Sequence, residues 1–385
     1  ACAGGSDAPG GDRVLTNGKV VTVDEARPEA EAIAVAGDRI VAVGTAAEIE
    51  AYIGESTTVI DLGGKLAIPG FIEGHGHFMG LGRAKMILDL TRARSWEEIV
   101  AMVGEAAKAA GPGEWILGRG WHQEKWDHVP ADAVDGVPVH RSLSAVSPNN
   151  PVYLTHASGH AAFANAKALE LAGITRATRD PAGGTIVRDA RGEPTGLLRE
   201  KAQGLVDAAI AEAESRSTEE ATAQMRRMVE LAGEDLLSKG VTSFHDAGTS
   251  FATVDFYERL AQEGALPVRL YVMVRADNDE LAEKLPRYRK IGVGGGYLTV
   301  RSIKRQIDGA LGPHGAWLLE PYADLPTTSG LALEPPEDIA RTAELAMQHG
   351  YQLNTHAIGD RANREVLDIY ERLLRSAPKG ADPRW

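Results

Sequence analysis

Apolar runs and amphipathic segments alternate along the chain from residue 69 to residue 385, and this alternation constrains the fold more than any other feature. Regular alternation of strands and helices is typical of parallel α/β proteins. No Gly-x-Gly-x-x-Gly follows an early strand, which argues against a doubly wound sheet and a dinucleotide-dependent oxidoreductase. The predicted fold is therefore a (β/α)₈ TIM-type barrel.

The expected elements follow from the period of the apolar residues. Predicted helices cover 96–110, 165–172, 217–239, 252–264, 278–290, 336–349 and 361–375. Predicted strands cover 115–118, 152–155, 241–245, 268–274, 299–304 and 351–355.

Two regions break this alternation. Residues 120–200 are rich in Gly, Pro, His and Arg and have weak periodicity, so we expect an insertion on one barrel loop that shapes a substrate pocket. Residues 13–68 hold short β-rich runs with turns at Asn17-Gly18 and Gly37-Asp38. They predict a small antiparallel β-domain that is too thin to be stable alone.

Residues 1–12 are mostly small and predict a flexible tether around Cys2, the single cysteine of the chain. One cysteine excludes an intrachain disulfide and a zinc site built from several thiolates. Small residues follow Cys2, as they follow the acylated cysteine of a bacterial lipoprotein, so Cys2 is a candidate lipid anchor; the alternative is a disordered N-terminus. The localisation stays open between the bacterial cell envelope and the cytoplasm.

The charge balance excludes some classes of function. The chain carries 54 acidic and 41 basic residues, a net charge of −13, which disfavours nucleic-acid binding. No apolar run approaches the roughly 18 residues of a membrane span. The charge of the substrate stays open, because a local pocket can oppose the overall sign.

The sharpest motif is His75-Gly76-His77, which follows the apolar run 66–72. Residues two apart on a strand point to the same side, roughly 6.5–7 Å apart at Cα, so two imidazoles can converge on one ion. Gly74 and Gly76 are expected to leave room for the rings and for substrate. We interpret the pair as metal ligands; the alternative is two unrelated histidines in a loop.

Two more residues end predicted strands, where barrel side chains face the active site. His356 follows the strand 351–355 and, beside the first two histidines, is expected to bind metal. Lys304 ends the strand 299–304. Its spacing alone favours a buried lysine paired with Asp308. The alternative is a lysine that has added CO₂ and bridges two metals through its carbamate oxygens.

These motifs resemble the amidohydrolase superfamily, in particular its YtcJ-like and N-substituted-formamide-deformylase-like metal-dependent hydrolases. The resemblance runs from about residue 13 to the end of the chain. It implies a (β/α)₈ barrel flanked by a small β-sandwich with strands from both chain ends. The matching segments are Pro69–His77, Asp180–Gly184, Gly192–Glu200, Gly240–Gly248, Asp308–Gly312 and Asn354–Asp360.

The resemblance also implies a function. His75 and His77 would bind one metal and His356 another, with Lys304 as a carboxylated bridging ligand and two zinc ions in the complete site. A metal-activated hydroxide would attack the C–N bond of an amide, formamide or cyclic amide. The partner would be a small-molecule substrate, and the oligomeric state stays open, with a homodimer as one option.

The chain departs from the family pattern at its C-terminal end. Past the position of Trp385 the family has a strand with a further His ligand and a later strand with an Asp that acts as general base. We therefore expect a barrel that is incomplete in this chain, a fragment of a longer enzyme, and no nameable catalytic base. The alternative is a truncated or degenerate amidohydrolase fold that binds a small ligand without catalysis.

Four residues are expected to contact substrate. Trp121 and His122 lie in a segment similar to the family's aromatic substrate-side loop, although Trp121 could equally be a core residue. His160 is either a substrate contact or a structural hydrogen-bond partner. His245 ends a predicted strand and, with Asp246, could polarise substrate or orient a metal ligand.

Charge alone adds two candidates for binding a substrate carboxylate, Arg199 and Arg305.

Overall fold

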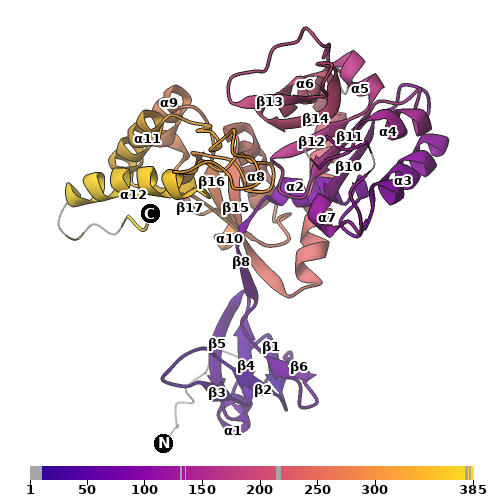
Figure 1. Ribbon diagram of the computed structural model, residues 1–385. Helices are drawn as coiled ribbons and strands as arrows, with labels where there is room; N and C mark the ends of the chain where they lie inside the picture. The colour runs from indigo at the N-terminus through magenta and orange to yellow at the C-terminus, as the bar shows by residue number, and fades with distance from the viewer. Residues whose placement is uncertain (1–10, 131, 135, 214–217, 378–379, 381–382) are drawn as a thin grey trace, which may run out of the picture. The chain divides into compact units, whose positions relative to one another are not determined.

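The computed structural model describes residues 11–130, 132–134, 136–213, 218–377, 380 and 383–385 (Figure 1). Cys2 and most of the predicted tether lie outside these residues. The chain divides into two compact units, Ala1–Phe71 and Ile72–Trp385. Among the described residues, no helix has both the length and the apolar character needed to cross a membrane.

The first unit contains two small sheets. One has the order β5-β4-β1-β6 and the other β3-β2-β7. The strands β1 and β6 pair in parallel, as do β2 and β7, so the sheets are mixed and the expectation of a purely antiparallel domain is wrong. The elements are β1 (Arg13–Thr16), β2 (Lys19–Val21), β3 (Glu29–Ala30), β4 (Ala32–Ala36), β5 (Arg39–Gly44), α1 (Ala46–Glu50), β6 (Thr58–Asp61) and β7 (Leu66–Ala67).

The core of this unit is thin. Val14, Ala32, Ala34 and Ile49 form its buried cluster, and two of the four side chains are single methyl groups. Because a methyl group buries little apolar area, this cluster contributes little stability. The expected β-sandwich stays a prediction.

The first sheet of the second unit holds five strands that neighbour one another in chain order, β8-β15-β16-β18-β19. From β15 to β19 the pairing is parallel, and the short β17 pairs antiparallel with β18. These strands are β8 (Phe71–Gly76), β15 (Val241–Thr249), β16 (Arg269–Val274), β17 (Lys290–Gly292), β18 (Leu298–Gln306) and β19 (Gln352–His356). Neighbouring parallel strands in chain order, with a helix after each, are the arrangement of a β/α barrel.

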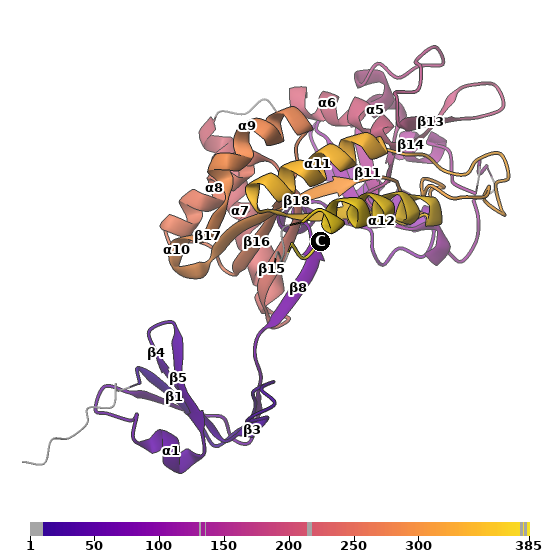
Figure 2. The same ribbon diagram turned by 90° about the vertical axis from the view of Figure 1, so that its left-hand side faces the viewer.

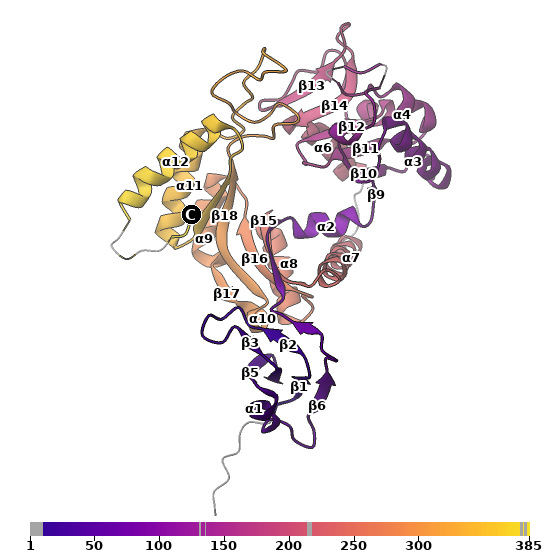
Figure 3. The ribbon, with the colours of Figure 1, turned by 60° about the horizontal axis from the view of Figure 1, so that its bottom comes forward.

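Helices follow these strands and bury the outer side of the sheet. Three of them, α9, α11 and α12, lie together, and α11 packs against β18 and β19 (Figures 1, 2 and 3). The helices of this part are α2 (Phe78–Ala84), α7 (Thr218–Leu237), α8 (Phe251–Gln262), α9 (Asn278–Tyr288), α10 (Val293–Gly296), α11 (Pro336–His349) and α12 (Asp360–Arg375).

The predicted helices agree with the observed ones to within two residues at each end. Local capping explains this accuracy. Ser250 accepts a hydrogen bond from Thr253 N at the start of α8, and Asp277 accepts from the first turn of α9. Gly350 ends α11 in the left-handed conformation (φ 70°), which favours glycine.

The second sheet of this unit has the order β13-β14-β12-β11-β10-β9. Its β9, β10 and β11 are parallel, and β12, β14 and β13 are antiparallel. The strands are β9 (Leu88–Asp89), β10 (Ile116–Trp121), β11 (Val152–His156), β12 (Ala161–Ala164), β13 (Gly184–Arg188) and β14 (Pro194–Glu200). The helices are α3 (Trp96–Ala109), η1 (Gln123–Lys125), α4 (Arg141–Val146), α5 (Ala166–Leu171), η2 (Lys201–Gln203) and α6 (Gly204–Ala213).

This sheet changes the expected organisation. The predicted strands 115–118 and 152–155 belong to it and not to the barrel sheet, so the extra structure begins near Leu88, earlier than residue 120. The pattern could not show this, because a parallel strand with its crossover helix looks the same in either sheet. Each face of the second sheet has its own core, with Phe163 and Leu197 on one face and Ala162 and Leu198 on the other.

Candidate active site

A cavity of about 600 Å³ lies where the barrel strands end. It is lined by His75 and His77 from the end of β8, Lys304 from β18 and His356 at the end of β19. The structure therefore brings together all four residues for which the sequence predicted a metal-binding role. Residues of the second sheet, among them His160, line the same cavity.

His75 and His77 lie on the same side of β8, with ring centroids 6.1 Å apart and ring planes at 81°. Both rings are exposed to the cavity. Partial desolvation and then the nearby Lys304 lower the pKa of His75; desolvation and the charges of His75 and Lys304 lower that of His77. Both rings are therefore held in the neutral form, which keeps a nitrogen lone pair for a metal.

The glycine between these histidines has a different role from the predicted one. A Cβ at Gly76 would overlap the ring of Phe244, which packs against the other side of the strand. Gly76 therefore makes space for the core, not for substrate. Gly74 has open space around it, with no heavy atom within 4 Å of an added Cβ.

A buried carboxylate fixes the turn after His77. Asp246 on β15 accepts a hydrogen bond from Phe78 N at 3.0 Å and one from the hydroxyl of Tyr257 at 2.9 Å. Burial raises the pKa of Asp246 to about 6. Asp246 and His245 are adjacent on the strand and so point to opposite sides. Asp246 orients the β8–α2 turn and does not line the cavity.

Lys304 is buried, with 6% of its surface exposed. Its side chain lies against Gly248, whose backbone has the left-handed conformation (φ 117°). Within the described residues it forms no ion pair with Asp308, so the pairing favoured by spacing alone is wrong. Asp308 is instead occupied by backbone amides. Burial, followed by the charge of Arg275, lowers the pKa of Lys304, which favours the neutral amine that can add CO₂.

Asp308 is completely buried and anchors the turn after His356. Its carboxylate accepts hydrogen bonds from Ile358 N (2.9 Å), Gly359 N (2.7 Å) and Trp317 N (2.8 Å). His356 Nε2 lies 3.7 Å from Asp308 Oδ1 and 3.5 Å from the carbonyl oxygen of Gly309. Asp308 therefore positions His356 by holding the backbone of the residues that follow it, Ile358 and Gly359.

His160 forms a buried pair with Glu200. Its Nδ1 lies 3.0 Å from Glu200 Oε2, and the two side chains are 12% and 6% exposed. Added Cβ atoms at Gly309 and Gly315 would overlap the Glu200 carboxylate, so these glycines form its niche. Glu200 itself has φ 50°. This backbone conformation costs free energy in residues other than glycine, and such residues are found most often at functional sites. The His160 ring is 5.3 Å from the His356 ring.

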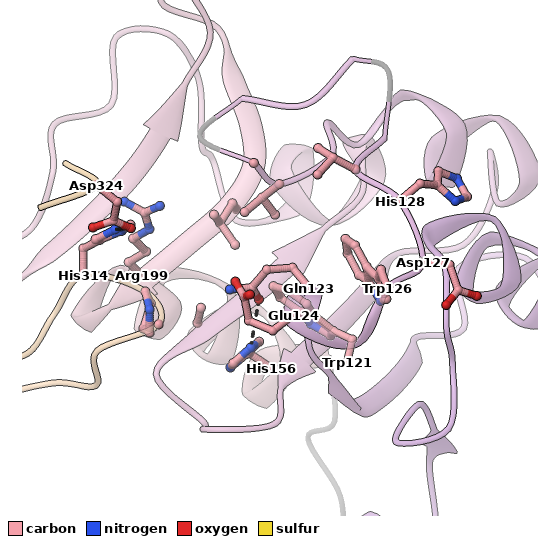
Figure 4. Close-up of a pocket in the computed structure, with 17 residues that line it drawn as sticks. Trp121, Gln123, Glu124, Trp126, Asp127, His128, His156, Arg199, His314 and Asp324 are labelled. Atoms are coloured by element: carbon pink, nitrogen blue, oxygen red, sulfur yellow. Dashed lines mark hydrogen bonds and ion pairs between the residues drawn. The ribbon is translucent and has the colours of Figure 1, made fainter.

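Trp121 lies outside this cavity. It is 2% exposed, donates its indole N–H to the carbonyl of Leu154 at 2.8 Å, and packs on Phe163. Trp121 also borders a second cavity of about 400 Å³ on the other face of the second sheet, together with Trp126 and His156 (Figure 4). His122 caps the short helix η1, and its ring is 4.6 Å from that of His156.

The other predicted contacts also lie apart from the cavity lining. The ring of His245 packs 4.8 Å from that of Tyr271. Arg199 borders the second cavity. Arg305 is buried in an ion pair with Glu334 at 2.8 Å and donates to the carbonyl of Ala276, so its charge is already compensated.

Four candidate metal donors line the cavity. His75, His77 and His356 supply neutral imidazoles from two strands. In the part of the chain that the structure describes, no three His, Cys, Asp or Glu side chains gather closely enough to hold an ion by themselves. The residues fit a metal when Lys304 supplies an oxygen ligand, which a lysine can do only after it has added CO₂.

Sequence reasoning did not predict the roles of three residues of the site, Glu200, Asp308 and Arg119. Glu200 and Asp308 lay in segments that match the family, but their partners are remote in sequence, so their roles required the fold. Arg119, which lines the cavity, carried one weak signal: it stands between two glycines at the end of a strand.

Comparisons with known proteins show which family the chain resembles. The amidohydrolase family model matches residues 58–384. The chain is 33% identical to protein LONG AFTER FAR-RED 3 of Arabidopsis thaliana, covering 94% of this chain and 61% of that protein. It is 32% identical to the putative amidohydrolase YtcJ of Bacillus subtilis, covering 92% and 65%. It is 30% identical to the N-substituted formamide deformylase of Arthrobacter pascens, covering 95% and 67%.

A solved structure shares the fold. An uncharacterized metal-dependent hydrolase from Pyrococcus horikoshii superposes with a TM-score of 0.66 at 26% identity, covering 94% of this chain and 68% of that one. The chain thus spans about two thirds of the length of the relatives that it matches. Its α/β architecture is that of a TIM-like barrel, and the chain belongs to the amidohydrolase family.

Proposed function

We propose that this chain is part of a metal-dependent hydrolase that cleaves the C–N bond of an amide, a formamide or a cyclic amide. One observation carries the proposal: His75, His77, Lys304 and His356 come from three barrel strands and line one cavity. Relatives named as an amidohydrolase and a formamide deformylase support the bond type.

His75 and His77 would hold one divalent ion and His356 a second, with the carbamate of Lys304 between them. We propose zinc. Such ions, when bound, polarise a carbonyl and lower the pKa of a bound water toward neutrality. The chain's own residues keep the ligands in place: Asp246 fixes the turn after His77, and Asp308 fixes the turn after His356.

His160 is one group that this chain presents to the substrate. Its Nδ1 is held by Glu200, so the opposite ring nitrogen is oriented by that hydrogen bond. From its place in the cavity lining it can hydrogen-bond to the substrate's carbonyl oxygen or leaving nitrogen. Glu200 acts through His160 as a positioning residue.

The test combines metal content with activity. The chain, purified without chelator, is expected to carry about two zinc ions by elemental analysis and to hydrolyse members of a panel of amides, N-substituted formamides and cyclic amides. His77→Ala should lower both the metal content and the rate. His349→Ala, at the end of α11 and away from the cavity, should change neither.

Lysine carboxylation has its own readout. Protein equilibrated with ¹³C-labelled bicarbonate should show a carbamate carbon resonance that disappears in Lys304→Ala. Absence of metal together with absence of turnover in the unaltered chain would refute the proposal and favour the ligand-binding alternative.

A further inference from the structure

The cavity has an unusual charge balance for an acidic protein. Three cationic side chains line it, Arg119, Lys201 and Arg275, beside Lys304, which is a carbamate in the proposed site. The acidic residues of its lining are Glu200, Asp207 and Glu334. Glu200 is paired with His160 and Glu334 with Arg305, so these two carboxylates are already engaged. Cationic side chains therefore gather in this cavity, although the chain has a net charge of −13.

The lysines and arginines of the lining differ in their partners. Lys201 Nζ donates to the carbonyl of Leu333 at 3.0 Å, and Arg275 donates to the side chain of Gln306 at 2.9 Å. Lys304 is the proposed metal-bridging residue. Arg119 has no ion pair and no side-chain hydrogen bond to any of the described residues. Its guanidinium is the cation that stays available to a ligand.

A β-bulge turns Arg119 toward the cavity. The pairing of β10 with β11 shifts between Arg119 and Trp121, and Gly120 at the bulge has φ 106°. On a regular strand, residues 119 and 121 would point to the same face. Here Trp121 enters the core while Arg119 lines the cavity. Bulges are known to re-aim side chains near active sites in this way.

The neighbouring turn leaves space for this guanidinium. Gly159 (φ 79°) lies beside it, and a Cβ there would be 3.4 Å from Arg119 Nη2. Arg119 is only partly exposed, and desolvation lowers its pKa. A desolvated guanidinium is costly unless an anion compensates it. Its planar donors match a carboxylate through two parallel hydrogen bonds.

We propose that the substrate carries a carboxylate and that Arg119 binds it, so that the preferred substrates are N-acyl amino acids or related acids with an amide-type bond. This inference rests on the proposed hydrolase function for the bond that is cleaved. A monoanion is favoured over a phosphate dianion, because Lys201 and Arg275 are held by other groups and one guanidinium remains.

Calorimetric titration tests the site without requiring turnover. The probes are N-acetylglycine and its uncharged analogue N-acetylglycinamide, each titrated into the full chain. A hydrogen bond to a charged group is worth roughly 1.5–3 kcal/mol, so the acid should bind about ten- to a hundredfold more tightly than the amide. Arg119→Met should abolish this preference.

Two further variants control for folding and for charge. Arg119→Lys should keep part of the preference, because it retains a cation without the planar pair of donors. Arg227→Met removes an exposed arginine of α7 that pairs with Glu230, and it should keep the full preference. Unchanged far-ultraviolet circular dichroism and thermal midpoint confirm that Arg119→Met is folded.

The outcomes separate this inference from the proposed function. Equal binding of acid and amide, no binding of either, or a preference that survives in Arg119→Met would overturn the carboxylate site. An Arg119-dependent preference without hydrolysis of any amide would support the site and count against the hydrolase. Hydrolysis of N-acyl amino acids at rates unaffected by Arg119→Met would support the hydrolase and refute the site.

Discussion

The turns after His77 and His356 are both held by a buried carboxylate, but they are fixed to different degrees. In each, a buried carboxylate from the neighbouring part of the sheet accepts amide hydrogen bonds from the residues that follow the histidine. Asp246 accepts one backbone amide, that of Phe78, and the hydroxyl of Tyr257. Asp308 accepts three, those of Trp317, Ile358 and Gly359.

The difference shows what each turn connects. The turn after His77 joins a strand to its own helix, and one backbone bond fixes it. The turn after His356 is tied in addition to the loop that follows β18, through Trp317. Asp308 thereby couples His356 to the loop whose Gly309 and Gly315 hold Glu200. A substitution that disturbs this turn should therefore affect more of the site than one that disturbs the turn after His77.

The largest effect is expected from Asp308→Ala. It leaves three backbone N–H groups without their acceptor, each at about 1–3 kcal/mol, so we expect a loss of at least about 3 kcal/mol. Asp246→Ala frees a single backbone amide and a hydroxyl, and should cost about 1–3 kcal/mol. Urea unfolding followed by circular dichroism measures both. A larger loss for Asp246→Ala would contradict the comparison.

A smaller effect is expected from adding one methyl group to either turn. A Cβ at Gly359 would overlap the backbone of Trp317, so Gly359→Ala should destabilise by about 1–3 kcal/mol. Gly74→Ala, before the other turn, meets no atom within 4 Å and should change stability by less than about 0.5 kcal/mol. Equal thermal midpoints for the two variants would show that the turns are packed alike.

The smallest effect concerns pH. Burial raises the pKa of Asp246 to about 6 from 3.8, so between these values the native carboxyl holds a proton that the unfolded chain has released. Asp246 therefore contributes stability below about pH 4 that is lost as the pH rises to about 6. Asp246→Asn lacks this dependence. The advantage of the unaltered chain over the variant should shrink by about 1–2 kcal/mol from about pH 4.5 to about pH 7.5. A constant difference in chemical unfolding would refute the raised pKa.

Sequence patterns located much of the site because its key residues are local signals. The motif His75-x-His77 and the strand-ending His356 could be read from spacing and from their places in the alternation, whereas the metal-binding role of Lys304 was implied only by the resemblance to the family. Helix ends were accurate because capping residues act within one turn. These features depend on few distant contacts.

The rest of the site depends on contacts between remote segments. Asp308 was expected to pair with Lys304, its neighbour in sequence, yet its partners lie 9 to 51 residues away. Arg119 could be recognised as a candidate for ligand binding only from the structure, which places its strand in the second sheet and not in the barrel sheet. Trp121 was placed near substrate by analogy, but the bulge at Gly120 sends it into the core.

The contact between Gly76 and Phe244 also opposes a slip of β8 by one residue, which would place a side chain over the ring. A slip of this strand by one residue would turn both imidazoles into the packed core and expose the glycine to the cavity. A slip by two residues would place Gly74 over the ring of Phe244 instead of Gly76. The two positions that face the cavity would then hold Glu73 and His75 instead of His75 and His77. The residue between two metal-binding candidates, which carries no functional group, therefore helps to decide which donors the strand presents.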